Sequence, residues 1–168
     1  MTPKLRILAG VAAVGVILDQ ISKQLIERTL IFGDSIAVIE GFFYLTRVHN
    51  RGAAFGLLAN LPESIRLMFF VGVTLIAIAV IISFFRKLAP GDRLAASSLG
   101  LILGGALGNL CDRARLGEVV DFLHFKLWQG YSWPDFNLAD SFIVVGVGLL
   151  ILELVAIEGD EDAESENA

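Results

Sequence analysis

Two aspartates, Asp121 and Asp140, stand beside apolar segments that are long enough to cross a membrane. They lie in the stretches 119–122 and 136–141. A carboxylate at membrane depth is costly, and such residues by default indicate a functional site. Two carboxylates that meet at one site share a proton, so that one acts as a base and the other as an acid. The pair therefore predicts aspartyl-type hydrolysis of a peptide bond where lipid meets water.

Asp140 follows signals that start a helix. Pro134, Asp135 and Asn137 directly precede an apolar run, and either Asp135 or Asn137 is suited to the N-cap position. Asp140 then lies in the first turn, where the helix dipole favours an ionised carboxylate. Asn137, Asp140 and Ser141 share one helix face because they are three and four residues apart. An ordinary acid at a helix start fits the same pattern, so the pattern alone does not define a site.

Asp121 lies in apolar company at the end of the third apolar segment. Such surroundings raise the pKa of a carboxyl group and favour its protonated form. If Asp121 and Asp140 converge, repulsion between like charges leaves one proton on the pair, and its position is a property of the pair. The helix start favours Asp140 as the ionised member.

The composition is that of a membrane protein whose body is close to neutral. Of the 168 residues, 55% are hydrophobic and 18% are charged, against about 45–50% and about 25% in soluble domains. Six of the 18 acidic residues fall in the last eleven positions, which leaves 13 basic and 12 acidic residues elsewhere. A neutral body gives no basic surface for nucleic acid. The segment 158–168 is predicted to be a disordered acidic tail.

The chain has one cysteine, Cys111, and two histidines, His49 and His124. A disulfide within the chain is therefore excluded, and a zinc site made of cysteine and histidine lacks ligands. A thiol nucleophile is poorly supported, because Cys111 falls in a helical apolar stretch where a small buried residue is common. We expect neither a metal nor a cofactor.

Four apolar stretches approach or reach the length of about 20 residues that a bilayer requires. They cover residues 5–22, 65–85, 94–111 and 137–157. The first follows Lys4 and could be mistaken for a secretory signal, but no small-residue cleavage site follows before Asp19, so we interpret it as a retained helix. The sequence predicts an all-α membrane protein with four transmembrane helices, in which residues 1–157 form a single domain.

Two outer segments, 23–64 and 112–136, are expected to connect the spans on one side of the membrane. The first holds the β-type runs 36–39 and 42–46, which predict a small sheet on the membrane face. Asn50, just beyond them, is able to bind an extended peptide through strand-type hydrogen bonds, although an ordinary turn also fits. Short basic segments precede the first span and join the second to the third, so the positive-inside rule places both termini in the cytoplasm and the sheet outside it.

Further polar residues lie within or next to the apolar stretches. Asp19 and Lys23 are four residues apart in the favoured order for a helical pair, and we interpret them as structural. Asn109, Asp112 and Arg113 share a helix face, behind glycines that allow helices to approach closely. Arg113 needs an anionic or carbonyl partner at this depth, and either Asp112 or a substrate carbonyl can supply it.

Five blocks of residues resemble the bacterial lipoprotein signal peptidase family, signal peptidase II, over nearly the whole chain. In family order they are Asp19 with Lys23, 50–55, 104–109 with Asp112 and Arg113, 119–122, and 136–141. Each block alone is a weak signal. All five together, in a four-span chain of this size, are highly specific.

The resemblance implies a membrane aspartyl endopeptidase with Asp121 and Asp140 as its catalytic dyad. Such enzymes cut the signal peptide from a prolipoprotein just before a cysteine that carries diacylglycerol. Family motifs place twelve more residues where they bind substrate or brace the site. These are Asn50, Gly52, Ala53, Phe55, Gly105, Asn109, Asp112, Arg113, Phe136, Asn137, Ala139 and Ser141.

The resemblance also implies partners and a location. Lipid-modified prolipoproteins and membrane lipid are the expected partners, without nucleic acid or metal, and a monomer is expected. The protein would be a multi-pass component of the bacterial inner membrane, with its active site at the outer, periplasmic face.

Two alternatives remain open on the residues alone. One is a small proton-coupled carrier that relays protons through Asp19, Asp121 and Asp140. The position of these acids near the span ends, and the lack of an evident inverted repeat, argue against it. The other is a structural subunit whose polar residues only lock helices together, and such a subunit should tolerate Asp→Asn changes.

Overall fold

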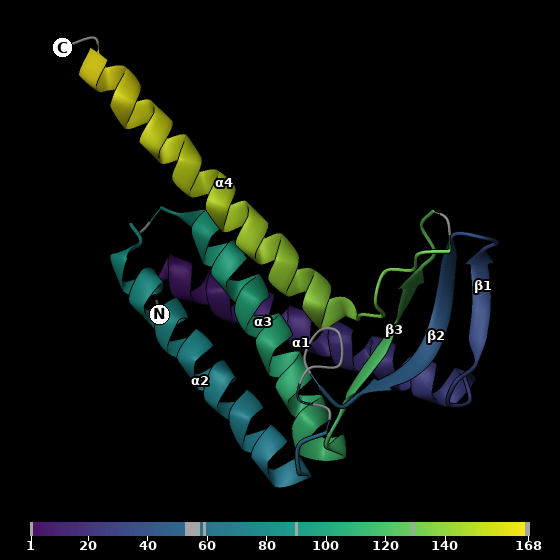
Figure 1. Cartoon of the computed structure of the whole chain (residues 1–168). Helices are drawn as coiled ribbons and strands as arrows, with labels where there is room; N and C mark the ends of the chain where they lie inside the picture. The colour runs from purple at the N-terminus through teal and green to yellow at the C-terminus, as the bar shows by residue number, and fades with distance from the viewer. Residues whose placement is uncertain (1, 53–57, 59, 90, 129, 167–168) are drawn as a thin grey trace.

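The computed structural model describes residues 2–52, 58, 60–89, 91–128 and 130–166. Within them the chain forms four long helices and a small sheet (Figure 1). The helices are α1 (Pro3–Thr29), α2 (Glu63–Lys87), α3 (Arg93–Leu116) and α4 (Leu138–Glu166). The strands are β1 (Ser35–Ile39), β2 (Phe43–Asn50) and β3 (Val119–Phe125).

All four helices are long and apolar enough to cross a membrane, α4 through its part Leu138–Ala156. This confirms the predicted fold class of four spanning helices with a small sheet. The helices extend beyond the apolar stretches, since α1 continues to Thr29 and α3 to Leu116. The outer segments are therefore shorter than 23–64 and 112–136, because polar residues there pair inside the helix bundle rather than ending the helices.

The last helix also runs further than its apolar part. Its backbone is helical as far as Glu166, whereas the part that is apolar enough to cross a membrane ends at Ala156. The disorder expected for the segment 158–168 stays a prediction.

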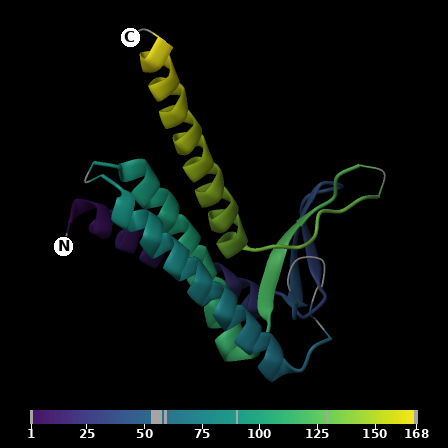
Figure 2. The same ribbon diagram turned by 60° about the vertical axis from the view of Figure 1, so that its left-hand side comes forward.

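α3 is the central helix of the bundle and packs against each of the other three. α4 diverges from the bundle toward its C-terminal end, as two views of the ribbon show (Figures 1 and 2). The N-terminus, the connection between α2 and α3, and the C-terminus lie at the end of the bundle opposite the sheet. The chain therefore has two chemically different ends, one of them formed by the sheet.

Close packing around α3 depends on residues without a side chain. A Cβ atom on Gly104 would lie 2.9 Å from the backbone oxygen of Ala12, and one on Gly100 would lie 2.9 Å from that of Leu8. Small residues are favoured at such helix interfaces in lipid because they let the backbones approach. This supports the packing role that the sequence indicates for the glycines of α3.

The sheet has the order β1-β2-β3 and is antiparallel throughout. β3 follows α3 directly, because Gly117 ends the helix in the left-handed region with a φ of 74°. Val48 and Asn50 of β2 lie opposite Asp121 and Val119 of β3, so the end of β2 runs beside the first aspartate. The sequence did not predict β3 and placed Asp121 at the end of a helical span.

The segment after β3 folds back along the same strand. Phe136 donates its backbone N–H to the carbonyl of Leu123 at 3.2 Å, and its own carbonyl accepts the N–H groups of Phe122 and Leu123 at 3.0 and 2.8 Å. These bonds hold the residue before Asn137, and therefore the start of α4, against β3.

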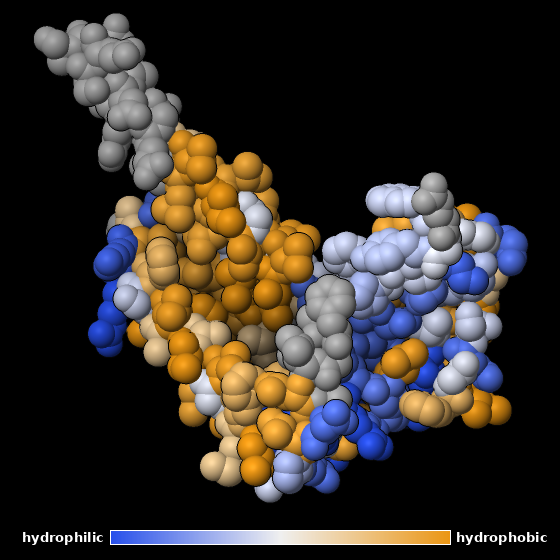
Figure 3. All heavy atoms as spheres, in the orientation of Figure 1, coloured by the Kyte–Doolittle hydropathy of each residue, from blue (hydrophilic) through white to orange (hydrophobic). Residues whose placement is uncertain are grey.

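The surface agrees with a membrane setting. Apolar side chains cover the helices in the view of Figure 3, whereas polar residues gather around the sheet. Large apolar side chains on the helices are widely exposed, for example Met68 at 73% and Val144 at 71%. Such exposure is expected where the surrounding solvent is lipid.

The packing of α3 yields a testable difference between two glycines. Gly104→Ala should destabilise the protein by about 1–3 kcal/mol, because the added methyl overpacks the contact with Ala12. Gly72→Ala in α2 has open space within 4 Å of its Cβ and should stabilise by up to about 1 kcal/mol through helix propensity. Thermal unfolding of both variants in the same detergent checks the prediction, and equal shifts would contradict it.

Candidate active site

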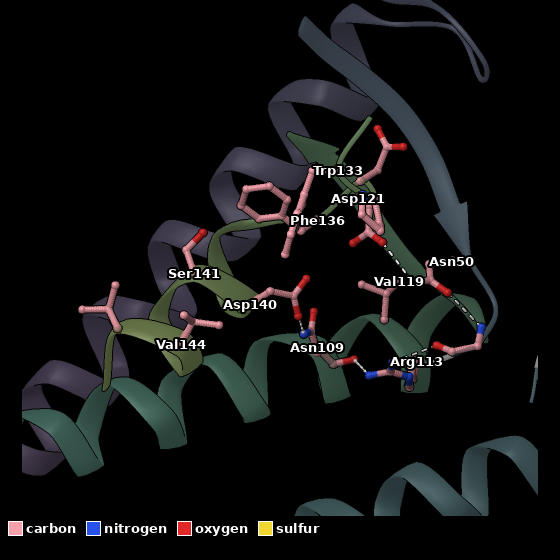
Figure 4. Close-up of a pocket in the computed structure, with 14 residues that line it drawn as sticks. Asn50, Asn109, Arg113, Val119, Asp121, Trp133, Phe136, Asp140, Ser141 and Val144 are labelled. Atoms are coloured by element: carbon pink, nitrogen blue, oxygen red, sulfur yellow. Dashed lines mark hydrogen bonds between the residues drawn. The ribbon is translucent and has the colours of Figure 1, made fainter. Parts of the chain in front are cut away.

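Asp121 and Asp140 line one cavity of about 600 Å³. Asp121 lies in the middle of β3, and Asp140 is the third residue of α4. Figure 4 shows the two carboxylates pointing toward one another from these two elements. The structure thus brings together the two residues on which the predicted chemistry depends.

Asp121 is almost fully buried, with 2% of its surface exposed. Its Oδ2 accepts a hydrogen bond from Asn50 Nδ2 at 3.0 Å, and its Oδ1 accepts one from Asn137 Nδ2 at 2.7 Å. Burial, followed by the neighbouring charge of Asp140, raises the pKa of Asp121 to about 7 from its usual 3.8, although the two amide bonds oppose the rise. The raised pKa favours the protonated form of Asp121 up to about neutral pH.

Asp140 accepts hydrogen bonds from one side-chain amide and one peptide N–H. Its Oδ1 accepts from Asn109 Nδ2 at 2.8 Å, and its Oδ2 accepts from the backbone N–H of Asn137 at 3.3 Å. Its own N–H donates to Asn137 Oδ1 at 3.0 Å, so Asn137 and Asp140 cap the helix reciprocally. This geometry confirms Asn137 as the N-cap, and the helix dipole adds to the stabilisation of the charge.

Three asparagine amides have their orientation fixed by a donor on the oxygen side. Lys23 Nζ donates to Asn109 Oδ1 at 3.0 Å, and Gly52 N–H donates to Asn50 Oδ1 at 3.0 Å. Asn137 Oδ1 is occupied by the N–H of Asp140 in the same way. Because each oxygen accepts from a group that can only donate, each NH₂ must face the carboxylates. Asn137 Nδ2 also donates to Asn109 Oδ1 at 3.2 Å.

Arg113 reaches the cavity from α3. Its guanidinium lies over the ring of Phe70 at 3.7 Å from the ring centre, and it donates to the carbonyls of Gly52 at 3.4 Å and Asn109 at 3.5 Å. The sequence proposed Asp112 or a substrate carbonyl as the partner of Arg113, but backbone carbonyls of the protein itself hold it, and Asp112 faces Lys23.

Asp19 and Lys23 form the predicted helical pair, with Lys23 Nζ at 2.8 Å from Asp19 Oδ2. Asp112 completes a cluster, because its Oδ2 lies 2.9 Å from the same ammonium. All three side chains are 0% exposed. The cluster adjoins the cavity, because Lys23 also bonds to Asn109, which lines it.

The remaining predicted residues divide by location. Asn50, Gly52, Asn109, Arg113, Phe136 and Ser141 join the two aspartates in lining the cavity. Asp112, Asn137 and Ala139 lie behind it, fully buried, and a Cβ on Gly105 would collide with the backbone oxygen of Ala139. Ala53 and Phe55 fall outside the described residues.

Sequence reasoning missed six residues that line the cavity: Val119, Trp133, Pro134, Asp135, Val144 and Val145. Val144 has a signal that would have found it, because it lies four residues after Asp140 on the same helix face. Trp133 and Pro134 could not be predicted as cavity residues, because only the pairing of their segment with β3 brings them there. Val144 and Val145 are 71% and 51% exposed, so the cavity has an apolar wall that reaches the lipid-facing surface.

No group of three or more metal-ligating side chains is found in the part of the chain that the structure describes. The fold and the site together define a polytopic membrane protein with two carboxylates, one buried and one half-buried, that face the same cavity.

Comparison with known proteins identifies the family. The family profile described as Signal peptidase (SPase) II matches residues 11–156. The lipoprotein signal peptidases of Geobacter metallireducens and Geobacter sulfurreducens are each 50% identical over 158 residues, covering 94% of this chain and 96% and 97% of theirs. A solved bacterial membrane enzyme superposes with a TM-score of 0.79 at 37% identity, covering 89% of this chain and 88% of its own.

The chain belongs to the signal peptidase II family and is a membrane peptidase. This confirms the family that the five motif blocks indicate. It also favours the peptidase over the proton-coupled carrier and the structural subunit.

The pKa of Asp121 predicts a dependence of stability on pH. Because the folded-state pKa of about 7 exceeds the unfolded value of 3.8, the native state binds more protons between these values. The stability from this group is fully present below pH 3.8 and is lost as the pH rises through about 7. Asp121→Asn should therefore flatten the decline of the melting temperature between pH 4 and 8. An equal decline in variant and wild type would contradict the shift.

Proposed function

We propose that the protein is an aspartyl endopeptidase that removes the signal peptide from diacylglyceryl-modified prolipoproteins, by cutting just before the lipid-bearing cysteine. The observation that carries the proposal is the pair of carboxylates facing one cavity, with Asn137 bonded to both. The names of the relatives, lipoprotein signal peptidases, support the substrate class.

The unequal surroundings of the dyad suggest one division of labour. Asp140, as the ionised member, takes a proton from a water molecule that attacks the scissile carbonyl carbon. Asp121, as the protonated member, gives its proton to the carbonyl oxygen, so a gem-diol forms without a free oxyanion. When the C–N bond breaks, Asp140 returns its proton to the leaving amine and Asp121 regains one from a gem-diol hydroxyl. Both carboxyl groups then have their starting protonation.

The amides support this cycle by fixing both carboxylates. Asn50 and Asn137 hold Asp121, while Asn109 and the backbone N–H of Asn137 hold Asp140. Neither carboxylate needs to reorganise during the reaction, which is the main source of electrostatic catalysis.

The apolar wall of the cavity suits a lipid-modified substrate. Val144 and Val145 extend from the dyad along α4 toward the lipid-facing surface. Each methylene that stays in hydrocarbon contributes about 0.8 kcal/mol, so two acyl chains anchor the substrate at the level of the dyad. We propose the inner membrane as the location, with both termini in the cytoplasm and the dyad at the periplasmic face, in keeping with the bases at the end opposite the sheet.

Asp121→Asn and Asp140→Asn should each abolish cleavage while expression and membrane insertion persist, because an amide can neither take up nor release the transferred proton. The assay is the conversion of a purified prolipoprotein carrying diacylglyceryl-cysteine, with mass spectrometry to identify the new N-terminus. Asp34→Asn, at an exposed turn before β1, is the matched control and should keep full activity. Retained cleavage in either dyad variant, or a cut elsewhere than before the cysteine, would reject the proposal.

Activity should also withstand chelation and thiol blocking, because the proposed cycle uses only carboxyl groups and water. The same assay with excess EDTA, and separately with a maleimide, measures this. Loss of cleavage in EDTA that is restored by one added metal would indicate a metal-dependent mechanism instead.

A further inference from the structure

The buried ammonium of Lys23 is surrounded by three acceptor groups. Its Nζ lies 2.8 Å from Asp19 Oδ2, 2.9 Å from Asp112 Oδ2 and 3.0 Å from Asn109 Oδ1. Two of its three N–H donors are used in the hydrogen bonds to Asp19 and Asn109, and the ammonium is also ion-paired with Asp112. Lys23 is therefore held by groups of the protein itself and is 0% exposed, so it does not reach a substrate.

The two carboxylates of the cluster each hold a peptide N–H in a particular place. Asp19 Oδ1 accepts from the N–H of Ala139 at 3.0 Å, and Asp112 Oδ2 accepts from the N–H of Val120 at 3.2 Å. Ala139 and Val120 are both 0% exposed, and each directly precedes one aspartate of the dyad. The ammonium thus joins the backbone before one dyad residue to the backbone before the other, with Gln20 Nε2 as a second, uncharged donor to both carboxylates at 3.3 and 2.8 Å.

A third link reaches the side chain of the dyad itself. Because Lys23 occupies Asn109 Oδ1, the NH₂ of Asn109 is turned toward Asp140 Oδ1, which it meets at 2.8 Å. This bond is visible in Figure 4. Without the ammonium, Asn137 Nδ2 at 3.2 Å would be the donor that remains on Asn109 Oδ1 among the described residues.

We propose that Lys23 is the positioning residue of the dyad: through Asp19, Asp112 and Asn109 it sets the separation and aim of Asp121 and Asp140. This inference rests on the proposed function. It differs from a general stabilising role, because it predicts slow catalysis by a protein that is correctly folded and binds substrate normally.

The test is the triple variant Asp19→Asn, Lys23→Met, Asp112→Asn, which leaves no unpaired charge in the buried cluster. Its two amides keep an oxygen for each peptide N–H, and the ammonium that joins them is lost. Only Gln20, whose Nε2 lies 2.8 Å from Asp112 Oδ1 and 3.3 Å from Asp19 Oδ2, still links the two positions. The melting temperature should change little and KM should stay close to the wild-type value. The kcat should fall about 10- to 100-fold, because a misplacement of about 1 Å costs roughly 100-fold in rate.

Lys4→Met is the matched control, since Lys4 lies on the same helix and ties α1 to the carbonyls of Phe85 and Leu88 at the other end of the bundle. This variant should keep the wild-type kcat. A folded triple variant with wild-type kcat would overturn the inference. Wild type and Asp121→Asn are assayed alongside, because an inactive wild type or an active Asp121→Asn contradicts the proposed function instead.

If the triple variant fails to fold, the single variant Asp19→Asn tests the positioning role of Lys23 instead. In this variant the charges of Lys23 and Asp112 still balance. In the wild type one oxygen of Asp19 accepts from Lys23 and the other from the N–H of Ala139, whereas asparagine offers a single oxygen for both donors. A lower kcat at unchanged KM supports the inference, and an unchanged kcat overturns it.

Discussion

The ammonium of Lys23, enclosed by two carboxylates and an amide, is the interaction on which the arrangement of this protein depends. A lone charge buried at this depth would be prohibitively costly, and the cluster persists only because each polar atom finds a partner. Those partners come from α1, α3, β3 and the start of α4. The need to pair these buried charges therefore fixes the position of the sheet relative to the membrane-spanning helices. Any shift between these elements would leave a donor or acceptor unsatisfied in a medium of low dielectric constant.

The same network gives two identical side chains different surroundings. Asp140 begins a helix and receives an amide, a peptide N–H and the helix dipole, whereas Asp121 lies in a strand among buried residues. Asn137 contacts both carboxylates, so it fixes their relative position while it caps α4. The difference in environment is built by backbone placement. It does not require a third titrating group in the cavity.

The sequence predicts the spanning helices and most of the site residues, and the features that it misses have physical causes. Apolar runs predict spanning helices because length and hydropathy are local properties. The site residues emerged through motif resemblance, and Asn137 as the N-cap emerged from the helix-start pattern. β3 was missed because a short apolar run next to a span does not distinguish strand from helix, and only pairing with β2 and with Phe136 decides. The contact between Lys23 and Asp112 joins residues far apart in the chain, so their spacing carried no signal.

The glycines of α3 show why packing and chemistry cannot be separated here. Gly104 admits the backbone of α1, as expected for helix association in lipid. Gly108, one turn further on, has a different reason, since a Cβ there would lie 2.6 Å from Asp19 Oδ2. The missing side chain makes room for a carboxylate of the Lys23 cluster rather than for a neighbouring helix backbone. Gly108, which the sequence indicates only as a helix-packing residue, therefore makes room for the polar network. Through Asp19, which accepts from the N–H of Ala139, it supports the position of Asp140.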